Sequence, residues 1–245
     1  MSDVYVSPPA APPPPPPRPP QAGYDFLRPF AFVFDDPRWL SKIGLGGLFV
    51  LLGFIVVGIP FLFGYAARLI RNVIAGVPQP LPEWDDLGEF FGEGLILFCV
   101  GLIYFLPVSI LSIASGIGST IVSAADQPAL RDIGGGIFGC ASCVISFVSL
   151  AVSLVFPAAL LMVITTRRFG AAFDFNAIFA FIRANAANYI IATLIEIVAW
   201  IFSYTGLVLF CVGIVFTQFW ALVASSYAFA QVWRQSTTPA TVVTA

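Results

Sequence analysis

The carboxylates that could do chemistry in this sequence gather in one short segment. Residues 78–94 read PQPLPEWDDLGEFFGEG and contain five of the chain's 13 acidic residues. Clustered carboxylates provide the oxygen ligands that Ca²⁺ and Mg²⁺ prefer, and they also attract a basic partner. The segment lacks the fixed glycine and the spacing of an EF-hand loop. A cation site is therefore the less favoured of two interpretations.

The favoured interpretation of this segment is structural. Asp86 and Glu89 have the spacing of a capping box, with Asp in place of Ser or Thr. Arg68 and Arg71 lie on one face of a helix, and we expect them to pair with the acids. The region also forms a candidate cytoplasmic interface for protein partners. Its residues are Arg68, Arg71, Glu83, Trp84, Asp85, Asp86 and Glu89.

Glu196 is the one charged side chain inside the long apolar stretches of the chain. A charge in the middle of a bilayer costs about 2.5–3.5 kcal/mol on insertion scales, so such residues face a bundle interior and often carry function. Its expected hydrogen-bond partners are Thr193, Thr217 and Gln218, and Glu196 with Gln218 is our candidate intramembrane polar site. The alternative is a glutamate that only fastens two helices together, and the sequence leaves both interpretations open.

Other kinds of chemistry have little support in the sequence. The chain has no histidine, which excludes Ser-His-Asp and Cys-His sets, and no glycine-rich phosphate loop follows a strand pattern. Cys140 and Cys143 have the spacing of a redox pair, but they lie in an apolar stretch. A nucleic-acid surface is not expected at a net charge of −2. We therefore expect no enzyme activity, no cofactor and no metal site.

The elements that must position these residues are membrane helices. The chain is 59% apolar and 10% charged, whereas soluble domains are about 45–50% apolar and about 25% charged. Its four long apolar stretches, residues 43–67, 94–125, 133–166 and 184–233, exceed the roughly 20 residues that cross a bilayer. We expect an all-α polytopic transmembrane helical bundle with the lipid bilayer as its partner. The hydrophobic runs are residues 43–67, 94–125, 133–166, 189–204 and 206–230.

Segments of different composition flank the helical membrane domain, residues 43–234. Residues 1–23 are proline-rich, which favours a disordered or polyproline II tail. This tail is interpreted as a spacer, with a ligand for an aromatic groove as the alternative. Residues 24–42 alternate aromatic and charged side chains, as in an interfacial lead-in at the headgroup level. We expect residues 235–245 to be a disordered tail.

The distribution of Lys and Arg predicts the topology, because cytoplasmic loops carry the excess. If the first run crosses the membrane once, the 11 basic residues are divided almost evenly between the two sides of the membrane. If it enters and returns, ten of them lie on one side and Arg131 alone lies on the other. We therefore expect a re-entrant hairpin in residues 43–67, broken at Gly58 and Pro60. Four full spans follow, with the last run turning near Tyr204. Both termini are then cytoplasmic.

Two amphipathic helices are expected on the cytoplasmic surface. The first follows Asp86, and the second spans residues 174–188. In each of them apolar side chains recur at helical spacing along one face. Burial of these faces in the membrane surface would explain the pattern without a partner.

The second and third hydrophobic runs carry small residues four positions apart. This spacing lets neighbouring helices approach closely, and we prefer this interpretation to a polar permeation path. The predicted packing residues are Ser112, Gly116, Thr120, Gly135 and Gly139.

The arginines Arg68 and Arg71 precede the sequence LPEWDD at residues 81–86. This combination resembles a family of uncharacterised bacterial and archaeal integral membrane proteins, classed as a domain of unknown function. The resemblance covers residues 40–234. It implies a multi-pass protein of the prokaryotic cytoplasmic membrane and a special role for the acidic motif, but it implies no reaction.

Two functional hypotheses follow from the sequence. The first is a non-enzymatic scaffold or accessory subunit of a membrane complex, whose cytoplasmic face meets membrane or cytoplasmic protein partners. The alternative is a small transporter or lipid-handling membrane protein that uses Glu196. A proton relay would need further titratable groups in the apolar runs, and the sequence shows no other acid or base there.

Overall fold

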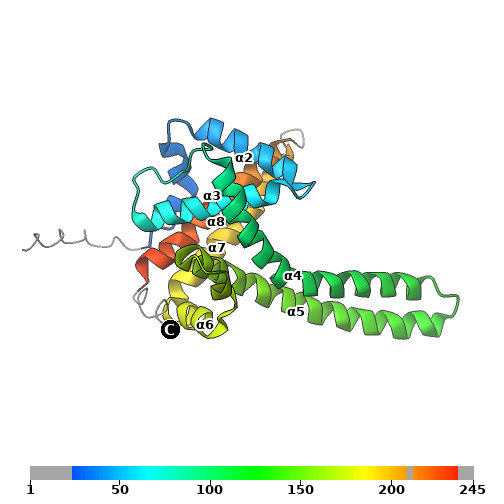
Figure 1. Cartoon of the computed structure of the whole chain (residues 1–245). Coiled ribbons are helices and arrows are strands. Elements are labelled where there is room, and N and C mark those ends of the chain that lie inside the picture. Colours follow the sequence, from blue (N-terminus) through cyan, green and yellow to red (C-terminus); the bar gives the residue numbers. More distant parts are fainter. Residues whose placement is uncertain (1–23, 209–211, 237–245) are drawn as a thin grey trace, which may run out of the picture.

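The computed structural model describes residues 24–208 and 212–236, which form helices with no strand among them (Figure 1). The predicted all-α class is therefore confirmed. The proline-rich tail 1–23, residues 237–245 and Cys211 lie outside the described residues. The elements in chain order are α1 (Arg28–Ala31), η1 (Phe32–Asp35), α2 (Trp39–Gly53), α3 (Gly58–Ala75), α4 (Leu87–Ser123), α5 (Pro128–Thr166), η2 (Phe169–Phe173), α6 (Phe175–Ala184), α7 (Ala186–Ser203), η3 (Tyr204–Val208) and α8 (Gly213–Gln235).

Four helices in the described ranges are long and apolar enough to cross a membrane. They are α4, α5, α7 extended by η3, and α8. The structure therefore supports a membrane-embedded protein with the predicted number of full spans. The predicted turn near Tyr204 is also present, because α7 ends at Ser203 and α8 starts at Gly213.

The first apolar run folds into a helical hairpin of α2 and α3, and its break lies earlier than predicted. α2 ends at Gly53 and α3 begins at Gly58, with Val56 between them at a φ of 70°. Pro60 is therefore the third residue of α3. A proline in the first turn removes no intrahelical hydrogen bond, so the helix continues through it. The correction is that the break falls in residues 54–57.

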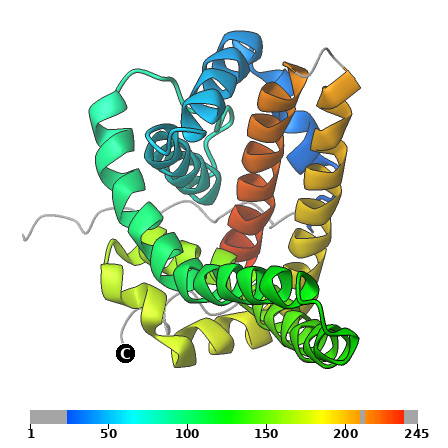
Figure 2. The ribbon, with the colours of Figure 1, turned by 90° about the vertical axis from the view of Figure 1, so that its right-hand side faces the viewer.

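The distal halves of α4 and α5 leave the helical body together and form a two-helix arm (Figure 1). In the view of Figure 2 the arm points toward the reader. The two helices have 37 and 39 residues, so each would be about 55–58 Å long if straight. Pro107 lies inside α4 and Pro157 inside α5, and interior prolines kink helices.

The predicted packing residues do not form the contact between the two helices of the arm. A Cβ atom at Gly116, Gly135 or Gly139 would meet nothing within 4 Å. Instead, Gly118 faces the ring of Phe138, and Gly134 faces Val122. The hydroxyls of Ser112 and Thr120 donate to carbonyls of their own helix, at 2.8 and 2.9 Å. The spacing thus identified small residues but not the face that meets the neighbouring helix.

The core of the body lies where α3 crosses α4 and where α8 runs between the other helices (Figure 2). A Cβ on Gly64 would lie 2.0 Å from the carbonyl oxygen of Phe90, and one on Gly94 would lie 1.6 Å from that of Pro60. The backbones of α3 and α4 therefore approach more closely than any side chain would allow. Tyr65 and Phe219 fill the centre of this core and are fully buried.

The two segments predicted to be amphipathic are helical. The first is the start of α4, and the second is α6, which ends before Asn185. On α6, Ile178 and Phe181 are buried against the body, while Phe175 and Phe179 are exposed. Of the predicted apolar face, only the exposed phenylalanines are therefore free to contact a membrane surface.

Candidate functional site

The segment of residues 80–86, here called the acidic latch, is fastened to α2 and α3 through its carbonyl groups. The carbonyls of residues 80–82 accept hydrogen bonds from Asn72 Nδ2, Lys42 Nζ and Tyr65 Oη, at 2.9, 2.9 and 3.0 Å. Two of these three residues are prolines, which have no backbone donor. Side chains from the two helices therefore bind the acceptors of an extended segment that forms no helix of its own.

A buried ion pair lies under the latch. Lys42 Nζ lies 2.5 Å from Asp36 Oδ2 and 2.6 Å from Glu83 Oε1, and the side chains of Lys42 and Asp36 are only 4% and 6% exposed. Burial raises the pKa of Asp36, but hydrogen bonds from Lys42 and from the backbone N–H of Arg38 outweigh it and hold this pKa below its ordinary value. Glu83 also accepts from Arg38 at 2.7 Å. Glu83 thus forms ion pairs with both Arg38 and Lys42.

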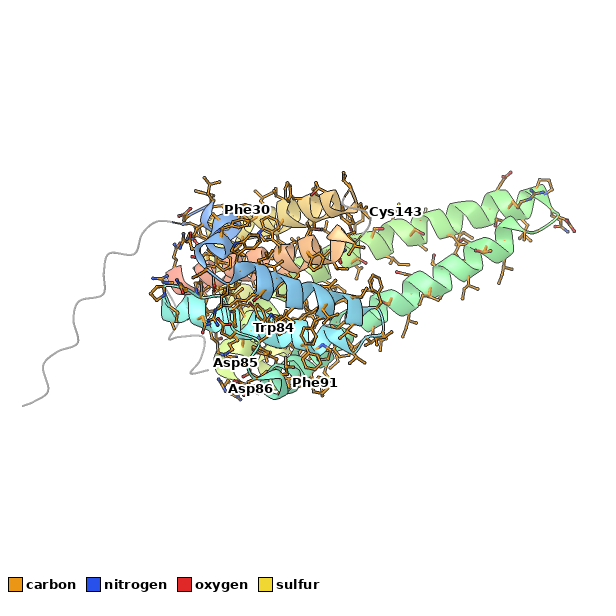
Figure 3. All side chains as sticks on the ribbon, turned by 90° about the horizontal axis from the view of Figure 1, so that it is seen from above. Phe30, Trp84, Asp85, Asp86, Phe91 and Cys143 are labelled. Atoms are coloured by element: carbon orange, nitrogen blue, oxygen red, sulfur yellow. The ribbon has the colours of Figure 1, made fainter. Side chains whose placement is uncertain are left out.

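Trp84 is a central packing residue of the latch. Its ring stacks between Phe49 and Tyr65, at centroid distances of 4.7 and 4.3 Å. Its Nε1–H donates to the carbonyl oxygen of Lys42 at 3.1 Å. Figure 3 shows Trp84 among the side chains of the body and Asp85 at its edge. The half-buried tryptophan therefore holds the latch in place against α2 and α3.

The arginines on α3 pair with Asp85 of the latch and with two acids at the start of α4. Arg68 lies 3.2 Å from Asp85 and 3.7 Å from Glu89. Arg71 instead pairs with Glu93 at 2.6 Å, an acid that we did not include in the candidate interface. Most of the charged side chains of the candidate interface are therefore paired with charges of opposite sign, and no ligand is needed to explain why they lie together.

Asp86 caps α4, as the capping-box spacing predicts. Its Oδ1 accepts a hydrogen bond from the backbone N–H of Glu89 at 2.9 Å. Of the candidate interface residues, Asp85, Asp86 and Glu89 are exposed, and 40% of the Glu83 side chain is exposed as well. Arg68, Arg71 and Trp84 are half-buried. Any partner on this face would therefore contact mainly carboxylates.

The intramembrane candidates Glu196 and Gln218 line one cavity of about 340 Å³. The cavity is lined mainly by residues of α3, α5, α7 and α8, with Val50 of α2 and Leu97 of α4, and most of its lining is apolar. The structure therefore brings together the two residues that the sequence paired. The expected partners Thr193 and Thr217 do not bond to Glu196, because their hydroxyls donate to the carbonyls of Tyr189 and Ser203.

Two serines on α8 add polar groups to this cavity. Ser226 donates to the carbonyl of Leu222 at 2.7 Å, whereas the buried hydroxyl of Ser225 has no hydrogen-bond partner. Glu196 makes no hydrogen bond or ion pair with any other described residue. Sequence reasoning missed both serines, although their positions seven and eight residues after Gln218 place them on the same helical face.

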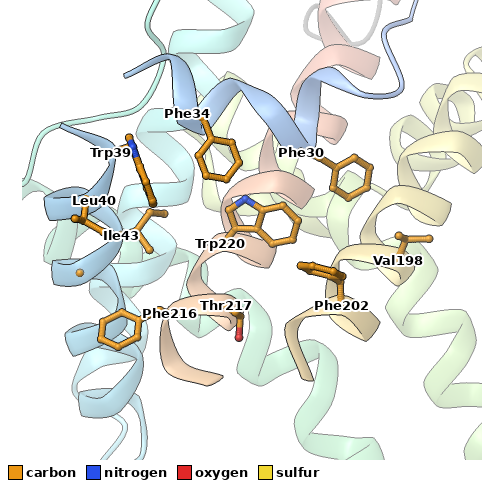
Figure 4. Close-up of a pocket in the computed structure, with 11 residues that line it drawn as sticks. Phe30, Phe34, Trp39, Leu40, Ile43, Val198, Phe202, Phe216, Thr217 and Trp220 are labelled. Atoms are coloured by element: carbon orange, nitrogen blue, oxygen red, sulfur yellow. The ribbon is translucent and has the colours of Figure 1, made fainter. Parts of the chain in front are cut away.

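A larger groove of about 950 Å³ opens elsewhere on the body (Figure 4). Its lining is almost entirely aromatic and aliphatic, and the indole of Trp220 lies at its centre. The Nε1–H of Trp220 is buried and has no acceptor within residues 24–208 and 212–236. The groove is lined by Phe30, Phe34, Trp39, Leu40, Ile43, Gly44, Val198, Phe202, Phe216, Thr217 and Trp220.

The described residues contain no cluster of cysteines and acids that could bind a metal ion. Cys140 and Cys143 are free and exposed on α5, and Cys99 is free and half-buried on α4. No three Cys, Asp or Glu side chains of that part are placed to hold one metal ion.

One family model matches the chain. It is described as "Protein of unknown function (DUF4013)", and the match covers residues 47–216. This range includes the acidic latch, the arm and Glu196. No curated protein and no solved structure matches the chain.

Proposed function

The chain belongs to the DUF4013 family of proteins of unknown function, and we propose that it binds a small amphipathic molecule within the membrane, in the cavity beside Glu196. The observation that carries this proposal is an apolar cavity that contains Glu196, Gln218 and a buried serine hydroxyl without a partner. Binding sites for small molecules are typically apolar hollows with a few convergent polar groups.

The chemistry of the lining specifies the ligand class. A carboxyl group surrounded by apolar side chains is costly unless a hydrogen bond or an opposite charge compensates it. A ligand head with hydroxyl or amine donors would satisfy Glu196, while its alkyl body would contact Leu97, Leu160 and Phe229. A volume of about 340 Å³ is at the small end of ligand sites, which suits one short chain. The role proposed is binding without catalysis.

This function can be tested with a photoreactive probe. We expect a diazirine-bearing short-chain alcohol to label α7 and α8 peptides of the purified protein in detergent. Glu196→Leu and Gln218→Leu remove the polar groups at similar volume, and each should reduce specific labelling at least tenfold. Glu89→Gln, an exposed change near the latch, serves as the matched control. Equal labelling of the Glu196→Leu protein, with unaltered gel filtration, would overturn the proposal.

A scaffold or accessory role remains a second proposal, and the arm now supports it better than the acidic latch does. Large apolar side chains such as Phe147 and Ile133 are exposed along the arm, and the small residues predicted to pack face open space there. A partner helix would cover both features. Benzophenone maleimide attached to Cys143 should then give one discrete crosslinked protein band in membranes. The same reagent on Cys99 should not, and labelling of lipid alone from Cys143 would contradict this role.

We further propose a prokaryotic cytoplasmic membrane with both termini on the cytoplasmic side. The excess of Lys and Arg supports this orientation. The contacts of Lys42, at the start of the first apolar run, with Glu83 after its end also support it, because the run must then return to the side from which it entered.

A further inference from the structure

The aromatic groove of Figure 4 shares no lining residue with the cavity beside Glu196. Its walls come from α2 and α7, its floor from α8, and its upper edge from Phe30 and Phe34 in α1 and η1. Thr217 contributes a hydroxyl, but this group is already bonded to the carbonyl of Ser203. The N–H of Trp220 is a buried donor without an acceptor among the described residues. Apart from this group, the groove offers a long apolar surface.

The polarity changes along the groove. At its edge, Phe30 and Phe34 belong to the same two short helices as Arg28 and Asp35, which form an exposed ion pair with charged atoms 2.6 Å apart. Beyond this edge the lining contains Ile43, Val198 and other apolar side chains. Aromatic side chains beside charged ones are typical of the headgroup level of a membrane. The groove thus runs from a charged edge into an apolar interior.

We propose that this groove binds one acyl chain of a glycerophospholipid, with the headgroup beside Arg28 and Asp35. The groove continues into the exposed apolar surface formed by Leu40 on α2 and by Val198 and Phe202 on α7. α7 is one of the helices apolar enough to cross a membrane, so this surface meets lipid. An acyl chain is apolar along its whole length, which matches a lining that is almost entirely aromatic and aliphatic.

The proline-rich segment of residues 1–23 is the competing occupant. Tyr24, the residue after this segment, donates a hydrogen bond to the carbonyl of Ala228 on α8, the helix that forms the floor of the groove. A proline-rich segment, however, carries one carbonyl acceptor per residue, and unsatisfied backbone acceptors are strongly disfavoured in hydrocarbon. Lipid is therefore the occupant that the lining favours.

Gly44 provides a sharp test, because it lines the groove and a Cβ there would meet nothing within 4 Å. Gly44→Phe should fill the groove without disturbing α2. Gly92→Phe is the matched control, because Gly92 is also helical and equally open. The readout is phosphatidylglycerol retained by the full-length protein after detergent purification, measured by native mass spectrometry.

We expect about one retained phosphatidylglycerol per chain in the wild type and in Gly92→Phe, and at least tenfold lower occupancy in Gly44→Phe. In nanodiscs with dibrominated phosphatidylglycerol, quenching of tryptophan fluorescence should fall in Gly44→Phe alone, because Trp39 and Trp220 line the groove. Equal retention by the two variants would overturn the proposal. Retention that appears only after deletion of residues 2–23 would also overturn it, and would assign the groove to the proline-rich segment.

Discussion

Lys42 shows how a charged side chain is accommodated in the core of this apolar protein. Its ammonium group has three N–H donors, and Asp36, Glu83 and the carbonyl of Leu81 lie within 2.9 Å of it. Breaking a buried pair by removing one partner typically costs about 3–5 kcal/mol, because a buried charge is left uncompensated. The charges under the latch therefore stabilise the position of the latch against α2.

The first prediction concerns the pH dependence of this pair. The pKa of Asp36 is held below its ordinary value of 3.8 in the folded protein. Its stabilising contribution is thus fully present above pH 4 and is lost as the pH falls through the folded-state pKa. Asp36→Asn should lower the free energy of unfolding by about 3 kcal/mol at pH 7, and the difference from wild type should shrink below pH 4.

Chemical unfolding in dodecyl maltoside at several pH values measures this difference. Asp35→Asn is the control, because Asp35 forms an exposed ion pair with Arg28 and such pairs contribute about 0–1 kcal/mol. If the difference in free energy of unfolding between wild type and Asp36→Asn grew as the pH was lowered, the stabilising role proposed for the ionised Asp36 would be excluded.

At the residue scale, the sequence predicted the site in part. The cap at Asp86, the pairing of Arg68 with acids and the proximity of Glu196 to Gln218 follow from spacing alone. The Lys42–Asp36 pair could not be predicted, because both residues lie in a segment whose alternating charges indicate exposure. Their burial depends on residues 80–86, about 40 positions away, and no local pattern encodes such a contact.

At the scale of elements, the crossing of α3 and α4 depends on glycine. A Cβ on Gly94 would lie 1.6 Å from the carbonyl oxygen of Pro60, so any side chain must force the helices apart. We predict that Gly94→Ala lowers the free energy of unfolding by about 1–3 kcal/mol or more, because overpacking typically costs this much. Gly92→Ala, two residues away in open space, should instead be neutral or add up to about 1 kcal/mol through helix propensity.

Thermal unfolding of the two variants in the same detergent provides the comparison. Equal melting temperatures for Gly94→Ala and Gly92→Ala would show that the two helices separate at little cost. That result would contradict the close crossing.

The prediction of elements succeeded where the chain itself carries the signal. Long apolar runs identified four spans, and the turn after Ser203 follows from a run twice as long as a membrane is thick. The break between α2 and α3 was misplaced, because a proline in the first turn of a helix does not stop that helix. The glycines of the α3–α4 crossing were missed, because spacing does not show which face of a helix meets its neighbour.

At the scale of the whole molecule, the contacts under the latch constrain how the chain enters a membrane. Lys42 precedes the α2–α3 hairpin and Glu83 follows it, yet their charged atoms lie 2.6 Å apart. Both ends of the hairpin therefore lie at one level of the body. α4 and α5 form a second antiparallel pair and α7 and α8 a third, and we expect each hairpin to return to the side of the membrane on which it began.

The last prediction is the resulting topology. In a chain without its native cysteines, single cysteines at Leu27, Gln79 and Asn176 should react with a membrane-impermeant maleimide only after the cytoplasmic side is opened. Cysteines at Gln127 and Thr205, in the turns of the second and third hairpins, should react in intact cells. All five positions are exposed, so burial within the protein does not prevent reaction.

External labelling of Leu27 together with cytoplasmic labelling of Gln79 would mean that the first run crosses the membrane, and a bilayer would then separate Lys42 from Glu83. Because that ion pair closes the latch on α2, such a result would contradict the structure of the latch as well as the orientation.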